Sequence, residues 1–131
     1  HGAVEVIRDA DAVAAEWAAI RDVTALAGRA GEVWRISVAP SDGPAVLTAL
    51  GDPPAIMDWG GGLIWAALPA GTDARAALAE VPGHATRLRG HPEGAVRAPV
   101  FQPEPALAPL ADALRARYDP RGILNPGLMD A

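Results

Sequence analysis

The sequence predicts an α+β domain, and three patterns in its 131 residues carry this prediction. Residues 32–40, EVWRISVAP, alternate in polarity as a half-buried strand does. Two short apolar runs, PAIMDWG and LIWAALP, meet at Gly60-Gly61-Gly62, which is typical of a β-hairpin. Two helix-like segments separate these strands from each other and from a last strand, HATRLRG. The order βαββαβ over residues 32–90 predicts a ferredoxin-like antiparallel sheet with both helices on one face.

The chain before this core, residues 1–31, predicts a short strand followed by one long helix. Residues 4–6 alternate in polarity, Asp9 is suited to cap the helix, and Gly28 is suited to end it. The apolar face of this helix carries Val13, Trp17 and Ile20.

The two helices of the core have recognisable ends. The first is predicted to begin at Ser41 or Asp42 and to stop at Gly51. The second is predicted over residues 72–81, TDARAALAEV, with Thr72 as its cap.

Residues 91–131 predict a strap, a helix and a tail. Five prolines over residues 91–109 indicate an extended strap. The helix that follows has Arg115 and Arg117 in its last turn, and its apolar face carries Leu107, Leu110, Leu114 and Tyr118. The tail holds the pair Ile123-Leu124 between two proline-containing turns.

Composition excludes several functions. Sixteen acidic against eleven basic residues give a net charge of −5, which argues against nucleic-acid binding. The absence of cysteine removes disulfides, thiolate nucleophiles and cysteine-based metal centres. No apolar run approaches the roughly 18 residues of a membrane span. The start at His1, with neither methionine nor leader, is interpreted as a cut, made either by excising a domain or by an engineered join.

The alternation along the strands predicts a cluster of arginines on the open face of the sheet. If Trp34, Ile36 and Val38 face the helices, then Arg35 faces the open side. The same alternation on the last strand places Arg87 and Arg89 there. Because adjacent like charges repel, a carboxylate, an anion or a partner is expected nearby, and Asp58 is the nearest internal carboxylate. Arginines on a solvated sheet face are an equally good interpretation.

Aromatic residues are divided between the core and the open face. Trp34 and Trp17 are predicted to pack in the core, and one of Trp59 and Trp65 is predicted to project onto the open face.

Catalytic and metal motifs are weak. His84, at the start of the last strand, is a candidate for proton transfer, although a structural, hydrogen-bonded histidine is more common. No second histidine stands at metal-ligand spacing, so no metal site is predicted. The glycine triplet precedes a strand and not a helix, which excludes a P-loop or Rossmann fingerprint. No Gly-x-Ser-x-Gly motif, catalytic carboxylate pair or Ser-His-Asp set is found.

The segment YDPRGILNPGLM resembles the C-terminal signature of FAD-linked oxidases of the vanillyl-alcohol oxidase type, aromatic-Asp-Pro-x-Gly-(Ile/Leu)-x-Asn-Pro-Gly. The segments EVWRISVAPSDGPAVL, AIMDWGGGLIW and PGHATRLRG, in this order and spacing, resemble the C-terminal half of the FAD-binding E subunits of bacterial glycolate oxidase. The resemblance extends from about Trp17 to Met129.

This resemblance implies a cap domain that follows an N-terminal, FAD-binding domain. Such subunits work beside a second flavin subunit and an iron-sulfur subunit and oxidise glycolate to glyoxylate, with a hydride passing to the flavin. The resemblance implies a cytoplasmic protein, peripheral to the inner membrane through its partner subunits. The chain alone is expected to bind no FAD and to be inactive.

Specific roles follow from the resemblance. The residues expected to face the flavin and a hydroxy-acid carboxylate are Arg35, Arg87, Arg89, Asp58 and Trp59, with His84 as a proton-handling neighbour. The residues expected to dock on the flavin domain are Ile123, Leu124 and Asn125, the last held extended by Pro126.

Two other functions compete with this one. A free-standing ferredoxin-like module that binds small acids explains the core without explaining the strap and tail. RNA binding on the open face requires a basic surface with paired aromatic residues, which this acidic chain does not supply.

Overall fold

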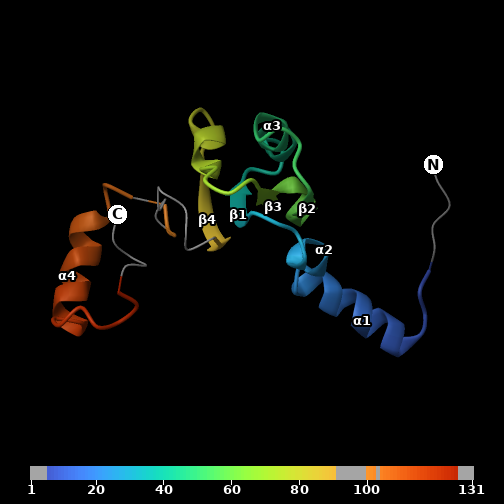
Figure 1. Ribbon diagram of the computed structural model, residues 1–131, viewed down its shortest axis with the longest axis horizontal. Helices are drawn as coiled ribbons and strands as arrows, with labels where there is room; N and C mark the ends of the chain where they lie inside the picture. The colour runs from blue at the N-terminus through green and yellow to red at the C-terminus, as the bar shows by residue number, and fades with distance from the viewer. Residues whose placement is uncertain (1–5, 91–99, 103, 127–131) are drawn as a thin grey trace.

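A computed structural model describes residues 6–90, 100–102 and 104–126 (Figure 1). Its centre is an open, four-stranded antiparallel sheet in the order β2-β3-β1-β4. The strands are β1 (Glu32–Val38), β2 (Ala55–Asp58), β3 (Leu63–Leu68) and β4 (Gly83–Arg89). The predicted α+β class and antiparallel sheet are confirmed.

One face of the sheet forms the main core under helix α3 (Gly43–Ala49) and the 3₁₀ helix η2 (Ala74–Leu78). The buried side chains of this core are Trp34, Ile36, Val46, Ile64, Ala66, Leu68, Ala74, Leu78 and Ala85. Because each large apolar side chain contributes about 1.5–3 kcal/mol when buried, this layer supplies most of the stability. The predicted orientation of Trp34 and Ile36 toward the helices is confirmed.

Helix α3 begins and ends as predicted. Asp42 precedes it, and Gly51 follows its end with φ of 83°. Gly43 is required at its start, because a side chain there would collide with the backbone carbonyl of Gly61 in the hairpin turn. The helix therefore lies directly against the β2–β3 connection.

The second core helix differs from its prediction. It is a single 3₁₀ segment over residues 74–78, and its cap is Asp73, whose carboxylate accepts a hydrogen bond of 3.0 Å from the N–H of Arg75. The predicted cap, Thr72, lies one residue earlier. Pro82 disfavours helical geometry at the residue before it, which limits the segment at its C-terminal side.

The predicted long N-terminal helix is two helices. Helix α1 (Ala10–Arg21) is capped by Asp9 as predicted, through a 2.8 Å bond to the N–H of Ala12. The chain then breaks at Val23, whose φ is 52°, and continues as α2 (Thr24–Ala27) up to Gly28. The break turns Leu26 onto the sheet, where it is buried. Of the predicted first strand, residues 4 and 5 lie outside the described residues, and Val6 is in no strand.

Helices α1 and α4 (Ala108–Tyr118) extend away from opposite sides of the sheet (Figure 1). Neither contains a buried residue. Trp17 is 67% exposed, so its predicted core role is wrong. Helix α4 ends with Arg115 and Arg117 as predicted, but its apolar face, Leu107, Leu110, Leu114 and Tyr118, is exposed. No helix within the described ranges has both the length and the apolar composition needed to cross a bilayer.

Candidate functional site

The second face of the sheet is divided between a covered and an uncovered half. Leu26 of α2 packs on Val33 and Ala67 and covers one half. The other half, over which no described helix packs and which we call the uncovered face, carries Arg35, Ser37, Asp58, Trp65, His84 and Thr86 together with buried Leu63, as the strand register shows.

Arg35 lies at the centre of the uncovered face. On β1 it stands between Trp65 of β3 and Thr86 of β4. Its guanidinium carbon is 5.6 Å from the ring centre of Trp59 and 5.9 Å from that of Trp65. Each cation–π contact of this kind contributes about 0.5–1 kcal/mol at an exposed site. Within the described residues, Arg35 forms no ion pair.

Trp59 is held beside Arg35 by a tight turn. The carboxylate of Asp58 accepts a 2.7 Å hydrogen bond from the N–H of Trp59 and begins the 3₁₀ helix η1 (Trp59–Gly61). Trp59 itself has φ of 53°. The predicted turn at the glycines is confirmed. Asp58 caps this turn and forms no described ion pair with the arginines, contrary to expectation.

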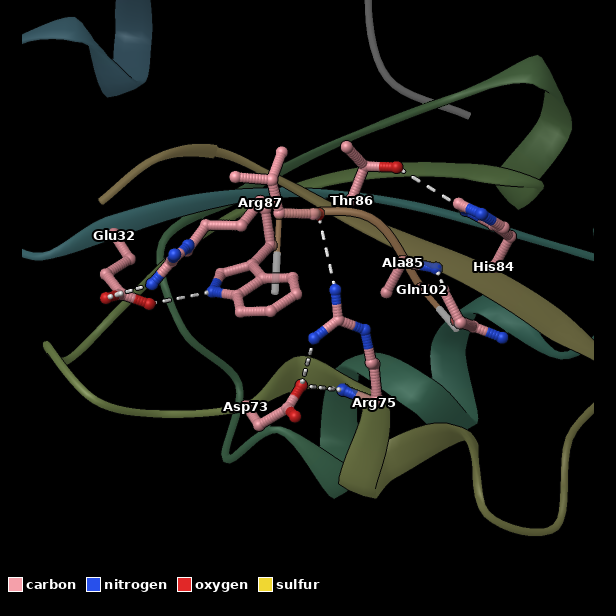
Figure 2. Close-up of polar contacts among 10 residues, drawn as sticks. Glu32, Asp73, Arg75, His84, Ala85, Thr86, Arg87 and Gln102 are labelled. Atoms are coloured by element: carbon pink, nitrogen blue, oxygen red, sulfur yellow. Dashed lines mark hydrogen bonds and ion pairs between the residues drawn. The ribbon is translucent and has the colours of Figure 1, made fainter. Parts of the chain in front are cut away.

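Arg87 does not face the open side, and this prediction is wrong. Trp34 pairs with Arg87 and Val33 pairs with Arg89, which leaves Leu88 as the extra residue of a β-bulge. Because Ala85 faces the core and β4 alternates regularly as far as Arg87, Arg87 lies on the same, helix side, where its guanidinium is 3.4 Å from the carboxylate of Glu32 (Figure 2). The bulge then breaks the alternation and returns Arg89 to the open side.

Arg89 lies on the predicted face but in its covered half. Its guanidinium donates to the carbonyl oxygens of Leu26, Ala27 and Arg29, at 3.2, 2.8 and 2.7 Å, and so caps the end of α2. The three arginines expected together are thus separated. Only Arg35 reaches the uncovered face.

His84 and Thr86 lie along β4 beside Arg35 and Ser37. The Nδ1 atom of His84 is 3.4 Å from the hydroxyl of Thr86, and both residues are half-buried (Figure 2). The role of His84 in proton transfer stays a prediction. Among the residues the structure describes, no three His, Cys, Asp or Glu side chains gather as a metal site.

A shallow hollow of about 360 Å³ adjoins Trp65. Its lining includes Val23, Leu26, Val33, Trp65, Leu88 and Arg89. Trp65 thus connects the uncovered face with an apolar depression beside α2.

The predicted docking residues lie in the tail after α4, which stays beside α4 and apart from the sheet (Figure 1). The N–H groups of Leu124 and Ile123 each donate a 2.9 Å bond to the Asp119 carboxylate and hold its pKa below the ordinary value. Ile123 and Leu124 are more than 60% exposed. Asn125 has φ of 47°, in the left-handed region, so the prediction that it is extended is wrong.

A polar network around Trp34 escaped the sequence interpretation. Glu32, which is 4% exposed, accepts a 3.3 Å hydrogen bond from the indole N–H of Trp34. The guanidinium of Arg75 stacks over the same indole, 4.9 Å from the ring centre. One signal was present, because a buried indole N–H needs an acceptor and Glu32 is two residues away on the same side of β1. No sequence signal pointed to Arg75.

The fold and this site define an α+β protein whose open antiparallel sheet presents an arginine guanidinium within 5.9 Å of two tryptophan ring centres. The chain matches no protein-family model, and it has no match among curated proteins or solved structures.

Proposed function

We propose that this chain is the C-terminal cap domain of an FAD-dependent 2-hydroxy-acid oxidoreductase subunit. In this proposal, a domain elsewhere in the same protein binds FAD, and glycolate is oxidised to glyoxylate. Electrons then pass to the flavin and on to an iron-sulfur subunit. The protein works in the cytoplasm, at the inner membrane through its partner subunits.

The ferredoxin-like assignment belongs to the same proposal. The strand order β2-β3-β1-β4 supports it, as does the placement of α3 and η2 on one face of the sheet. The short 3₁₀ segment η2 stands where a longer helix is usual in that arrangement.

The observation that carries the proposal is the contact of the Arg35 guanidinium with the rings of both Trp59 and Trp65, at 5.6 and 5.9 Å. A guanidinium can bind a carboxylate through two parallel N–H donors, and the adjacent indoles offer flat apolar surface. A small hydroxy acid needs such a cation for its carboxylate. His84, beside Thr86, is the group placed to take part in proton transfer.

The residues present fit one side of a flavin site. Trp59, Trp65 and Arg35 offer a flat surface and one positive charge, while the chain contains no glycine-rich FAD-binding loop. FAD, bound mainly by the other domain, would supply the hydride-accepting chemistry. The residues of this chain would orient the carboxylate and exclude water.

The exposed apolar faces support a docking role. Trp17 on α1, Leu110 on α4, and Ile123 and Leu124 in the tail are all more than 60% exposed. Large apolar surfaces of this kind mark interaction sites. In the proposal they pack against the FAD-binding domain and the partner subunits.

The first test is flavin binding by the intact protein. We expect the longer protein that contains this chain to purify with FAD and to be reduced by glycolate, while the 131-residue chain purifies without flavin. An intact protein that binds no flavin contradicts the proposal.

The second test is Arg35→Ala in the intact protein. Losing a charge-assisted hydrogen bond of roughly 1.5–3 kcal/mol is expected to lower kcat/KM for glycolate by about ten- to a hundredfold. Arg29→Ala, which changes an exposed arginine outside the uncovered face, is the control. Equal values of kcat/KM in the two variants would show that Arg35 does not bind the substrate.

A free-standing module that binds small acids is the second candidate, because Arg35 is accessible without any further domain. Thermal-shift measurements of the 131-residue chain with a panel of carboxylic acids separate the two. If an acid stabilises the chain and Arg35→Ala abolishes this effect, the module is favoured. If none of the acids stabilises the chain, the cap domain is favoured.

A further inference from the structure

The two edges of the sheet differ in how they are protected from pairing with another chain. Unpaired N–H and C=O groups on an edge strand can take up a foreign strand. The edge strand β2 has four residues and follows Pro53 and Pro54, and both shortness and proline oppose pairing. The other edge strand, β4, has seven residues and no proline. It therefore needs another form of protection.

The charged side chains of β4 do not protect its edge. Arginine and lysine usually oppose edge pairing by projecting from the edge. The guanidinium of Arg87 is directed to Glu32, and that of Arg89 is directed to the end of α2. Both positive charges are thus turned away from the edge.

Residues 100–102 of the strap cover this edge instead. The N–H of Arg87 donates to the carbonyl oxygen of Val100 at 3.0 Å. The side-chain amide of Gln102 accepts from the N–H of Ala85 at 2.9 Å (Figure 2). It also donates to the carbonyl oxygen of Gly83 at 3.2 Å. Gln102 therefore takes the place of one peptide group of a fifth strand.

Residues 100–102, which cover the edge of β4, are held firmly at Val100 and weakly at Gln102. The carbonyl oxygen of Val100 also accepts a 3.3 Å bond from the guanidinium of Arg75, which stacks on buried Trp34. At the other end, two backbone groups of β4 depend on the single half-buried side chain of Gln102. Loss of that side chain would uncover Gly83 and Ala85.

We propose that the outer edge of β4 is a strand-addition site for the β4 strand of a second copy, closed in each chain by residues 100–102. Gly83, Ala85 and Arg87 all direct backbone groups outward. Two copies related by a two-fold axis at Thr86 would pair Ala85 of each with Arg87 of the other, as antiparallel strands do. In this pairing, the outward backbone groups of both copies are satisfied at once.

The test is Gln102→Leu in the 131-residue chain, with Glu104→Leu as a control that adds the same side chain at an exposed position. We expect Gln102→Leu to form dimers with increasing concentration in sedimentation equilibrium, while the control stays like the wild type. In dilute solution the Ala85 amide should exchange about tenfold faster than in the wild type, because one hydrogen bond is lost. Exchange should slow again as dimers form.

Two results would overturn the proposal. One is a Gln102→Leu chain that is monomeric at all concentrations. The other is an unchanged exchange rate of Ala85 in the dilute variant. If Gln102→Leu does not fold, Gln102→Glu replaces it. That variant keeps the acceptor for Ala85 but loses the donor to Gly83, so it should dimerise at neutral pH and revert when the carboxyl is protonated. Failure of both variants to fold also overturns the proposal, because a removable cover is not needed for folding.

Discussion

Glu32 is the residue on which the polar part of the core depends. Its carboxylate is within 3.4 Å of two donors, the indole of Trp34 and the guanidinium of Arg87, and it is almost fully buried. Its removal would leave both donors buried without this acceptor, and such losses cost more than the bonds themselves contribute.

We expect Glu32→Ala to lower the free energy of unfolding by about 3 kcal/mol in urea titrations. Glu80→Ala, at an exposed position, should change it by less than about 0.5 kcal/mol. Similar values for the two variants would show that Glu32 is not a structural acceptor.

Asp119 makes the turn after α4 sensitive to acid. Its folded pKa is lowered mainly by the N–H groups of Leu124 and Ile123, so the unfolded carboxyl binds protons more tightly than the folded one. The stabilisation is complete above the unfolded pKa of about 3.9 and is lost as the pH falls through the lower, folded value.

An NMR titration of the Asp119 carboxyl carbon should therefore give a midpoint below about 3.9. The amide signals of Ile123 and Leu124 should shift with the same midpoint, and Asp119→Asn should abolish that shift. A midpoint at or above the ordinary value would contradict the hydrogen bonds that define this turn.

At the scale of single elements, the caps and breaks decide where each helix lies. Asp9 could be identified as a cap from its position before apolar, helix-forming residues. The start of α3 was predicted at Ser41 or Asp42, and it follows Asp42, whose side chain makes no capping hydrogen bond. The break at Val23 could not be predicted, because a β-branched residue rarely takes a positive φ. Burial of Leu26 on the sheet accompanies this strained conformation.

The cap of η2 provides a direct test at this scale. Asp73→Ala removes the acceptor of the Arg75 N–H and should destabilise the chain by about 1 kcal/mol. Thr72→Ala should have a smaller effect, since the structure gives the cap to Asp73. Thermal unfolding of both variants measures the difference in stability. A larger loss of stability for Thr72→Ala would show that Thr72 is the cap, as the sequence predicted.

At the scale of the whole molecule, the sheet with α3 and η2 holds the core, and α1 and α4 lie outside it. Helices of 12 and 11 residues are marginal on their own in water. Because none of their residues is buried, α1 and α4 can open without disturbing the sheet.

Hydrogen exchange should resolve this difference. We expect amides of α1 and α4 to exchange at least about a hundredfold faster than those of β1 and β3. In the intact protein of the proposed function, the same helices should become protected by docking. Uniform exchange across helices and strands of the 131-residue chain would contradict this division.

Sequence patterns were sufficient to predict the four strands of the sheet, the hairpin and the core-facing side chains of β1. These depend on local periodicity and on turn residues, and Trp34, Ile36 and the glycine turn were predicted for that reason. The sequence also predicted that Arg35 faces away from the helices, because β1 is regular at that position.

Which arginines share a surface depended on contacts between distant parts of the chain. Burial of Ala85 in the core turns Arg87 to the helix side, and the bulge at Leu88 returns Arg89 to the open side, where it donates to carbonyl oxygens at the end of α2. The tertiary structure also joined residues distant in sequence, such as Gln102 with Ala85 and Arg87 with Glu32. Local sequence patterns do not predict such features, because they depend on residues far apart in the chain. Examples are a β-bulge, a hydrogen bond from a distant segment and the exposure of a helix face.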